Sequence, residues 1–530
     1  MNLLPSAEEV RLRRLARQHA DGGQWEAAQA ALELLARQAP NDVTVLVDLA
    51  DVLFRRGRLR QAATAVMQVA RRLPRDGLLI IGVAKRLVAF GEILAARACL
   101  DLLAQAPAPP ADLLVAQAHL RFSLGEIAAA KTLVEKAIVA GADSPEALQL
   151  HAMLLHFTGD IEQAQCVLES CLERWPHFGD AAMALVNLRK QQPESHRLEW
   201  WRGRLRQLPD NEADPSAMFI RAEFEYAQFK TLDDLERYDE AWPALARCNA
   251  IMRKLNPYDA AAEAAITDAL MHLSLSSGQA NEPQGPTPIF IVGMPRSGTT
   301  LLDRMLSAHS QVASAGEIID FWRQLHWAAD VAPAQSQQLL EVIRRSAGLD
   351  YAELGARYLK QTQWRAQGRA YYIDKLPANI QMVAFIRKAL PHAPILHMVR
   401  DPVDTCFSNF KAMFGNISPY SYDQQALAHY YGQYARLARH WHARFPGAML
   451  DVHYAELVRD PGNAIRRVLA HCGLAMEEGC LRPERNAAPV ATPSSAQVRE
   501  AIHTRSLDQW RNYEKQLHPL RQALDGYLGS

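Results

Sequence analysis

The sequence predicts two folds in one chain: an all-helical array of repeats, followed by an α/β domain with a mostly parallel sheet. In the first half, five glycines recur every 34 residues. In the second half, short apolar runs alternate with helix-length segments, a pattern typical of parallel sheets covered by helices. Between the halves, residues 276–288 are rich in Ser, Gly and Pro and indicate a domain boundary.

The composition limits the classes of function. The 530 residues include 58 Lys and Arg and 58 Asp and Glu, so the formal net charge is zero, which argues against nucleic acid or an anionic membrane as a partner. The seven cysteines lack metal-binding or disulfide spacing, so we expect reduced thiols and no metal site. Neither a signal peptide nor a membrane-spanning run is recognisable, and a cytoplasmic location is expected.

The glycine period is typical of helical hairpins. Each glycine is followed five residues later by an alanine, where a small side chain lets two helices approach closely. The glycines are Gly23, Gly57, Gly91, Gly125 and Gly159, and the alanines are Ala28, Ala62, Ala96, Ala130 and Ala164. The pattern resembles tetratricopeptide repeats and assigns residues 1–190 to them.

Residues 191–283 form a separate region in this interpretation. The glycine register is lost after Pro193, and Glu236 stands where a glycine is expected, with Ala241 five residues later. We interpret the region as a degenerate repeat and capping helices, because a solenoid needs an atypical last unit. The repeats are predicted to be a docking platform, and a sharper hypothesis is that they hold a protein or peptide substrate.

Residues 284–530 contain near their start the stretch PIFIVGMPRSGTTLL (288–302), which predicts a strand, a loop and a helix start. The loop is bounded by Gly293 and Gly298. Backbone N–H groups at the start of a helix can surround a phosphate or sulfate. An ATP-binding P-loop has Lys after its second glycine, whereas this chain has Thr299, and the cation of the loop is Arg296. The loop therefore indicates a phosphate-like ligand other than ATP.

Three further strands are predicted at 371–373, 395–399 and 449–452, each followed by polar residues. Because the carboxyl ends of parallel strands meet at one edge of a sheet, these polar motifs are expected to converge there. Arg400 follows one strand and Ser408 lies about two helical turns later, so both can bind one phosphate. Alone this signal is weak, since Arg-Asp-Pro also occurs in ordinary helix-entry turns.

Together the motifs resemble the sulfotransferases, in particular bacterial tetratricopeptide-repeat sulfotransferases and protein-tyrosine sulfotransferases. The shared motifs are PRSGTTLL (295–302), GE (316–317), DKLP (374–377), the Arg400 and Ser408 pair, VHYAELV (452–458), SSAQVR (494–499) and WRNY (510–513). The resemblance implies a P-loop-type α/β domain that moves a sulfuryl group from 3'-phosphoadenosine 5'-phosphosulfate to an acceptor hydroxyl. It also implies adenosine 3',5'-bisphosphate as product and no metal requirement.

The resemblance implies roles for individual residues. Glu317 would be the base that takes the hydroxyl proton, and Arg296 and Lys375 would neutralise the leaving oxygen. Ser494 matches a serine near the transferred group. The 5'-phosphosulfate would be held by Pro295, Arg296, Ser297, Gly298, Thr299 and Thr300. The rest of the donor would be held by Arg400 and Ser408 at the 3'-phosphate, Tyr454 near the adenosine, and Arg505 and Trp510 near the C-terminus. A family lysine is replaced by Gln509, for which Arg505 or Arg511 would substitute.

Several alternatives stay open. Glu317 could cap a helix, and Lys375 could be a surface lysine. A kinase or NTPase is a second functional hypothesis, in which Asp451 ends a strand and holds Mg²⁺. A third is a repeat scaffold with a non-catalytic nucleotide-binding domain. The HWH stretch at 440–442 lacks a third ligand at metal spacing. The acceptor, with a peptide tyrosine among the candidates, and the oligomeric state stay open.

Overall fold

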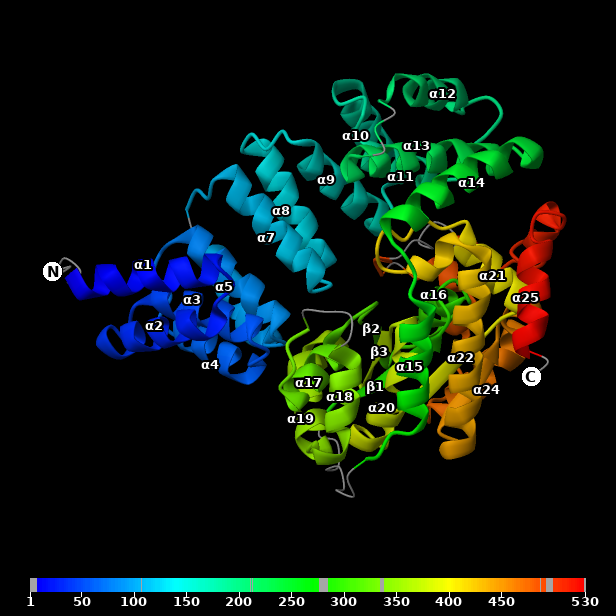
Figure 1. Cartoon of the computed structure of the whole chain (residues 1–530). Helices are drawn as coiled ribbons and strands as arrows, with labels where there is room; N and C mark the ends of the chain where they lie inside the picture. The colour runs from blue at the N-terminus through cyan, green and yellow to red at the C-terminus, as the bar shows by residue number, and fades with distance from the viewer. Residues whose placement is uncertain are drawn as a thin grey trace.

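A computed structural model describes residues 7–105, 107–209, 211, 213–275, 285–333, 338–486, 488–491 and 499–528. In Figure 1 the chain runs from a helical array, blue to green, into an α/β domain, green to red. Both parts of the predicted fold class are confirmed. Within the described residues, no helix is both long enough and apolar enough to cross a membrane.

Five helical hairpins make up the repeat array. They are α1 (Ala7–Asp21) with α2 (Trp25–Gln38), α3 (Val43–Arg55) with α4 (Leu59–Ala70), α5 (Gly77–Ala89) with α6 (Ile93–Leu103), α7 (Ala111–Ser123) with α8 (Ile127–Val139), and α9 (Pro145–Thr158) with α10 (Ile161–Arg174). The five repeat glycines lie at the turns inside the hairpins with φ between 69° and 97°, a conformation that favours glycine. All five repeat alanines are fully buried, as close helix packing requires.

Five more helices connect the array to the α/β domain. They are α11 (Gly179–Leu188), α12 (Leu198–Gln207), α13 (Pro215–Asp234), α14 (Tyr238–Leu255) and α15 (Ala260–Met271). Glu236, between α13 and α14, has φ 61° and adopts the left-handed conformation that the repeat glycines have. Helix α15 packs against α22 (Gln424–Arg444), and Leu270 belongs to the core of the α/β domain. The domain limits at 190 and 283 stay a prediction.

The sheet has five parallel strands in the order β2-β3-β1-β4-β5. They are β1 (Thr287–Gly293), β2 (Val312–Ser314), β3 (Tyr371–Lys375), β4 (Ile395–Val399) and β5 (Met449–His453). The four predicted strands are confirmed, whereas β2 is a three-residue edge strand too short for an apolar run to reveal. The strand that carries the glycine loop, β1, is central, so the polar motifs after β3 and β4 flank the loop directly.

Helices cover both faces of the sheet. One face carries α16 (Thr299–Leu306), α23 (Tyr454–Arg459) and α24 (Pro461–His471). The other carries α17 (Asp320–Ala329), α19 (Tyr351–Thr362), α20 (Val383–Ala389) and α22. Because side chains alternate along a strand, neighbouring residues of β4 and β5 point to different helical layers.

The repeat array contacts the α/β domain at two places. At the first, carbonyl groups near the hairpin turns of repeats three to five accept hydrogen bonds from side chains of the α/β domain. The donors and acceptors are Gln324 Nε2 and Gly91 at 2.7 Å, Arg365 and Leu124 at 3.3 Å, and Arg499 and Phe157 at 2.7 Å. At the second, Asn249 of α14 donates to the Phe410 carbonyl at 2.9 Å. The later repeats and the connecting helix α14 are thus each attached to the α/β domain.

Candidate active site

The glycine loop joins the end of β1 to the start of α16. Ser297 is buried, and its Oγ donates to the Met294 carbonyl at 2.7 Å, which closes the turn. Arg296 has φ 64°, an uncommon conformation for a residue with a side chain. Gly298 is the N-cap residue of α16 and leaves the helix without a side-chain cap. The first N–H groups of α16 therefore keep the capacity to bind an anion.

Both loop glycines are required by close approaches. At Gly298, φ is 108° and a Cβ atom would lie 2.4 Å from Cδ2 of Tyr454. At Gly293, φ is 148° and a Cβ atom would lie 2.7 Å from the Met398 carbonyl oxygen. The loop is thus held between β4 and the first residue of α23, and Tyr454 lies against it.

A buried ion pair lies at the end of β3. Lys375 is fully buried, and its Nζ donates to Oε1 of Glu317 at 2.5 Å. The Glu317 side chain is 39% exposed, so the pair is open to solvent on the carboxylate side. The surface-lysine alternative is wrong. Glu317 also lies outside α17, whose N-cap residue is Ile319 and has no side-chain cap bond, so the helix-cap alternative is wrong as well.

A second carboxyl group lies close to Lys375. Asp303 of α16 is buried and accepts a hydrogen bond from Ser314 Oγ at 3.0 Å. Burial raises its pKa, and the positive charge of Lys375 offsets part of that rise. The sequence contained a signal for this residue, since Asp303 follows Thr299 by one helical turn and shares its face of α16. Lys375 therefore lies between two carboxyl groups.

Arg400 occupies the other side of the loop. Its side chain is 8% exposed, its Nη1 donates to the Arg296 carbonyl at 3.1 Å, and its Nη2 donates to the Ser506 carbonyl. The guanidinium carbon lies 4.7 Å from the centre of the Tyr454 ring. The structure thus brings Arg400 together with the loop, Tyr454 and the C-terminal segment.

Helix α21 (Pro402–Phe410) contributes the neighbouring polar groups. Ser408 is half-buried, and its hydroxyl has no hydrogen-bond partner among the described residues. Asn409, which the sequence did not single out, is fully buried and donates to the Pro295 carbonyl at 2.8 Å. This bond fixes the loop relative to the helix that carries Ser408.

The environment of Arg296 includes the repeat part of the chain. Burial lowers the pKa of Arg296, the nearby charge of Arg400 lowers it further, and the charges of Tyr226 and Glu317 oppose the shift. Tyr226 belongs to α13, and its hydroxyl donates to Asn187 Oδ1 at 3.0 Å. Tyr226 precedes the loop by 70 residues, and only the tertiary structure reveals that it lies near Arg296.

The residues predicted near the C-terminus differ in how exposed they are. Trp510 is buried in the 3₁₀ helix Gln509–Tyr513, whereas the Arg505 side chain is 68% exposed and pairs with Glu500. Gln509 Oε1 accepts a hydrogen bond from Lys411 Nζ at 3.0 Å. Lys411, which the sequence did not suggest, thus places a cation beside Gln509, and the substitution by Arg505 or Arg511 stays a prediction. Ser494 lies outside the described residues.

The HWH stretch has partners that the sequence did not reveal. Asp451 Oδ1 lies 2.8 Å from Nε2 of His442 and 2.8 Å from Nδ1 of His397. These partners have no metal spacing along the sequence, because β4, β5 and α22 meet only in the folded chain. Met398 faces α16, so its neighbour His397 and the bonded Asp451 face the other side of the sheet. Asp451 is thus turned away from the glycine loop, which removes the support for a Mg²⁺ ligand there.

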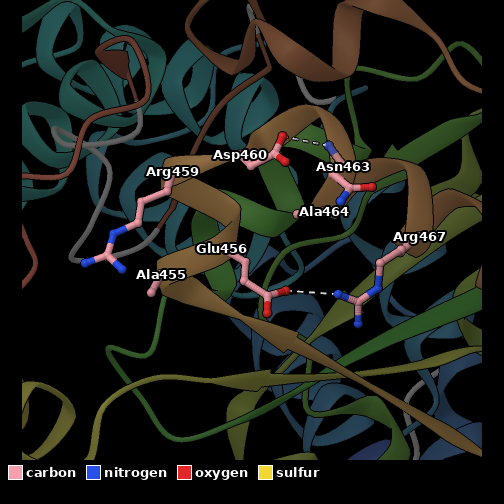
Figure 2. A pocket seen from close by; sticks show the side chains of 7 residues that line it. All are labelled: Ala455, Glu456, Arg459, Asp460, Asn463, Ala464 and Arg467. Atoms are coloured by element: carbon pink, nitrogen blue, oxygen red, sulfur yellow. Dashed lines mark hydrogen bonds and ion pairs between the residues drawn. The ribbon is translucent and has the colours of Figure 1, made fainter.

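A surface hollow lies apart from these residues. Figure 2 shows it between α23 and α24, with a volume of about 220 Å³. Its lining residues are Ala455, Glu456, Arg459, Asp460, Asn463, Ala464 and Arg467. Glu456 and Arg467 pair at 2.9 Å, and Asp460 caps α24 through the Asn463 N–H. One ion pair thus occupies the hollow, and none of the predicted site residues lines it.

Parts of this chain are similar to known proteins. An uncharacterized protein of Aquifex aeolicus is 28% identical over 320 residues, which are 57% of this chain and 41% of that protein. A protein-tyrosine sulfotransferase of Drosophila melanogaster is 26% identical over 239 residues, 42% of this chain and 46% of that protein. This chain therefore spans less than half the length of either relative.

A solved structure and a family match complete the comparison. The sulfotransferase domain of the Synechococcus PCC 7002 olefin synthase is 22% identical, with 44% of this chain and 91% of that chain covered and a TM-score of 0.32. Residues 288–478, from β1 to just beyond α24, match the sequence model of the sulfotransferase family. Residues 288–478 are therefore similar to the sulfotransferase family, and they follow a helical array whose hairpins repeat every 34 residues.

Proposed function

We propose that the chain is a sulfotransferase that uses 3'-phosphoadenosine 5'-phosphosulfate as donor and an acceptor hydroxyl as substrate. The observation that carries the proposal is the ion pair of Lys375 and Glu317 beside a glycine loop with an uncapped helix start. When bound, the donor supplies an activated sulfuryl group. The residues of this chain fit its two anionic ends, because the loop and Arg400 lie on neighbouring strands.

Each residue has a distinct task in this proposal. Glu317, partly exposed, takes the proton of the acceptor hydroxyl. An ammonium group has three N–H donors, and one of those of Lys375 is used by Glu317. Lys375 can therefore contact the carboxylate and the leaving oxygen together. Arg296 and the N–H groups of Gly298, Thr299 and Thr300 add positive potential at the same oxygen.

The other side of the loop binds the distal phosphate. Arg400 and Ser408 hold the 3'-phosphate, the first by charged hydrogen bonds and the second by a hydroxyl whose capacity is unused among the described residues. Tyr454 stacks under Arg400 and bounds the adenosine side. Arg505, Trp510 and Ser494 stay proposals for the C-terminal wall of the site.

The repeats support a protein or peptide acceptor, with a tyrosine hydroxyl as the first candidate. A Cβ atom at Gly125, in the turn of repeat four, would lie 3.8 Å from the Ala315 carbonyl oxygen, and Ala315 precedes Glu317 by two residues. The repeat array, which in this proposal holds the peptide, thus comes close to the proposed base. A screen of peptide, glycan and lipid pools with labelled donor tests the acceptor class, and modification of lipids or glycans alone would contradict the peptide assignment.

Calorimetric titration tests the donor. We expect adenosine 3',5'-bisphosphate to bind without added metal and more tightly than ATP with Mg²⁺, because the loop lacks the P-loop lysine and Asp451 faces away from it. Tighter binding of ATP with Mg²⁺ would overturn the proposal in favour of a kinase or NTPase. Bisphosphate binding without sulfuryl transfer to any acceptor pool would favour a non-catalytic binding domain.

A further inference from the structure

Three side chains from three elements converge beneath strands β4 and β5. His397 lies on β4, Asp451 on β5 and His442 on α22. One ring nitrogen of each histidine lies 2.8 Å from Oδ1 of Asp451, and the three potential ligand atoms all lie within 4.8 Å of one another. Because these residues come from separate segments, the cluster exists only in the folded chain.

The donor set is typical of a transition-metal site. Two imidazole nitrogens and a carboxylate oxygen are ligands that Zn²⁺ accepts in four-coordinate sites, with water as the fourth ligand. With bond lengths of about 2.0–2.1 Å, ligand atoms around Zn²⁺ lie roughly 3.3 Å apart. On metal binding the 2.8 Å contacts would widen by about half an ångström, and the two histidine nitrogens, which lie within 4.8 Å of each other, would move closer together.

The cluster is accessible to an ion. The His397 side chain is 5% exposed, while those of His442 and Asp451 are 35% and 40% exposed. The cluster thus combines one buried side chain, on β4, with two side chains that solvent reaches.

A further contact orients His397 for ligation. Its Nε2 lies 2.6 Å from the hydroxyl of Tyr434 on α22. A histidine that binds metal through one ring nitrogen commonly donates the N–H of the other to an oxygen. With the proton on Nε2, donated to Tyr434, Nδ1 is free to bind an ion. Metal binding thus requires a change of tautomer rather than the loss of a buried partner.

We propose that His397, His442 and Asp451 bind one Zn²⁺-class ion with a structural role. The ion would join the edge strand β5 to β4 and to α22, on the face of the sheet away from the glycine loop. These are the strands whose carboxyl ends carry Arg400 and Tyr454. The inference does not depend on the proposed sulfuryl transfer.

Metal binding by tag-free full-length protein tests the proposal. After chelation and dialysis, the protein is titrated with Zn²⁺ and with Co²⁺, and bound metal is counted by elemental analysis. We expect one tightly bound equivalent per chain and a rise in Tm with Zn²⁺. The Co²⁺ complex should show visible d–d bands without a thiolate charge-transfer band. A thiolate band would overturn the proposal and assign the ion to cysteine.

The variants make the assignment specific. His442→Ala should lose the bound equivalent and the Zn²⁺-dependent rise in Tm, whereas His440→Ala, on the same helix but outside the cluster, should keep both. The nearly isosteric Asp451→Asn should also lose the bound equivalent and the rise in Tm. If His442→Ala does not fold, Asp451→Asn tests the metal site in its place. Retention of one tight equivalent in Asp451→Asn, or no tight binding by the wild-type protein, would overturn the proposal.

Discussion

Lys375 and Arg400 are both buried cations at the carboxyl edge of the sheet, yet their surroundings differ. Lys375 ends β3 and pairs with the Glu317 carboxylate at 2.5 Å. Arg400 follows β4 and gives its hydrogen bonds to the carbonyl oxygens of Arg296 and Ser506, with the nearest carboxylate, Asp404, at 3.8 Å. One cation is therefore neutralised by a charge, and the other mainly by backbone dipoles.

The difference indicates different uses. In the first pair the lysine is fully buried, whereas the Glu317 carboxylate is 39% exposed. The pair is thus assembled before any ligand arrives, with its carboxylate open to an acceptor. Neutral carbonyls compensate a guanidinium less than a carboxylate does, so an anion can replace them with a gain in binding. Arg400 is accordingly suited to ligand binding rather than to chemistry.

The largest expected effect is that of Glu317→Gln on turnover. Glutamine keeps an oxygen that accepts from Lys375, so the fold should persist, but it cannot take a proton. We expect turnover to fall about 10²- to 10⁴-fold, the usual contribution of a general base, while calorimetry shows unchanged bisphosphate affinity. Glu353→Gln, an exposed glutamate on α19, is the matched control. Full activity in Glu317→Gln would remove the base assignment.

Lys375→Met should have the next largest effect. The substitution keeps the buried volume and removes the charge, so stabilisation of the leaving oxygen is lost, at a cost of about 10²- to 10³-fold in kcat. Transfer of labelled sulfuryl groups measures it. Lys360→Met, at an exposed lysine of α19, should keep wild-type turnover. If both variants were equally active, Lys375 would serve only to neutralise Glu317 and Asp303.

Arg400→Ala should act on binding instead of turnover. A charged hydrogen-bonded contact contributes roughly 1.5–3 kcal/mol, so we expect bisphosphate to bind about 10- to 150-fold more weakly in calorimetry. At saturating donor, kcat should change little. An unchanged Kd would contradict the 3'-phosphate assignment, and a loss confined to kcat would make Arg400 equivalent to Lys375.

Arg505→Ala should have the smallest effect. Its exposed side chain pairs with Glu500, and exposed charge pairs contribute at most about 1 kcal/mol. We expect the Kd for bisphosphate to rise less than about fivefold, with a decline of that small effect at higher salt. A loss as large as that of Arg400→Ala would show that the C-terminal segment moves Arg505 onto the ligand.

Local sequence patterns identified most of the architecture and the loop. Gly159 and Ala164 mark a hairpin because a left-handed turn and a close helix contact each demand one residue type, and both requirements are visible along the chain. The motifs that begin at Arg296, Lys375 and Arg400 follow predicted strands, so the rule that parallel strands end at one edge was enough to bring them together.

Tertiary structure alone decided which side chains from distant segments meet. Three pairs show this: Tyr226 with Arg296, Lys411 with Gln509, and His397 with Asp451. The members of each pair share no sequence period, because their contacts depend on how α13, α21 and β5 pack. The pairing of Glu317 with Lys375 lies between these two cases. The resemblance named both residues, whereas their ion pair follows from the burial of the lysine in the folded chain. A residue type is constrained locally by backbone conformation, whereas its partner is selected by long-range packing.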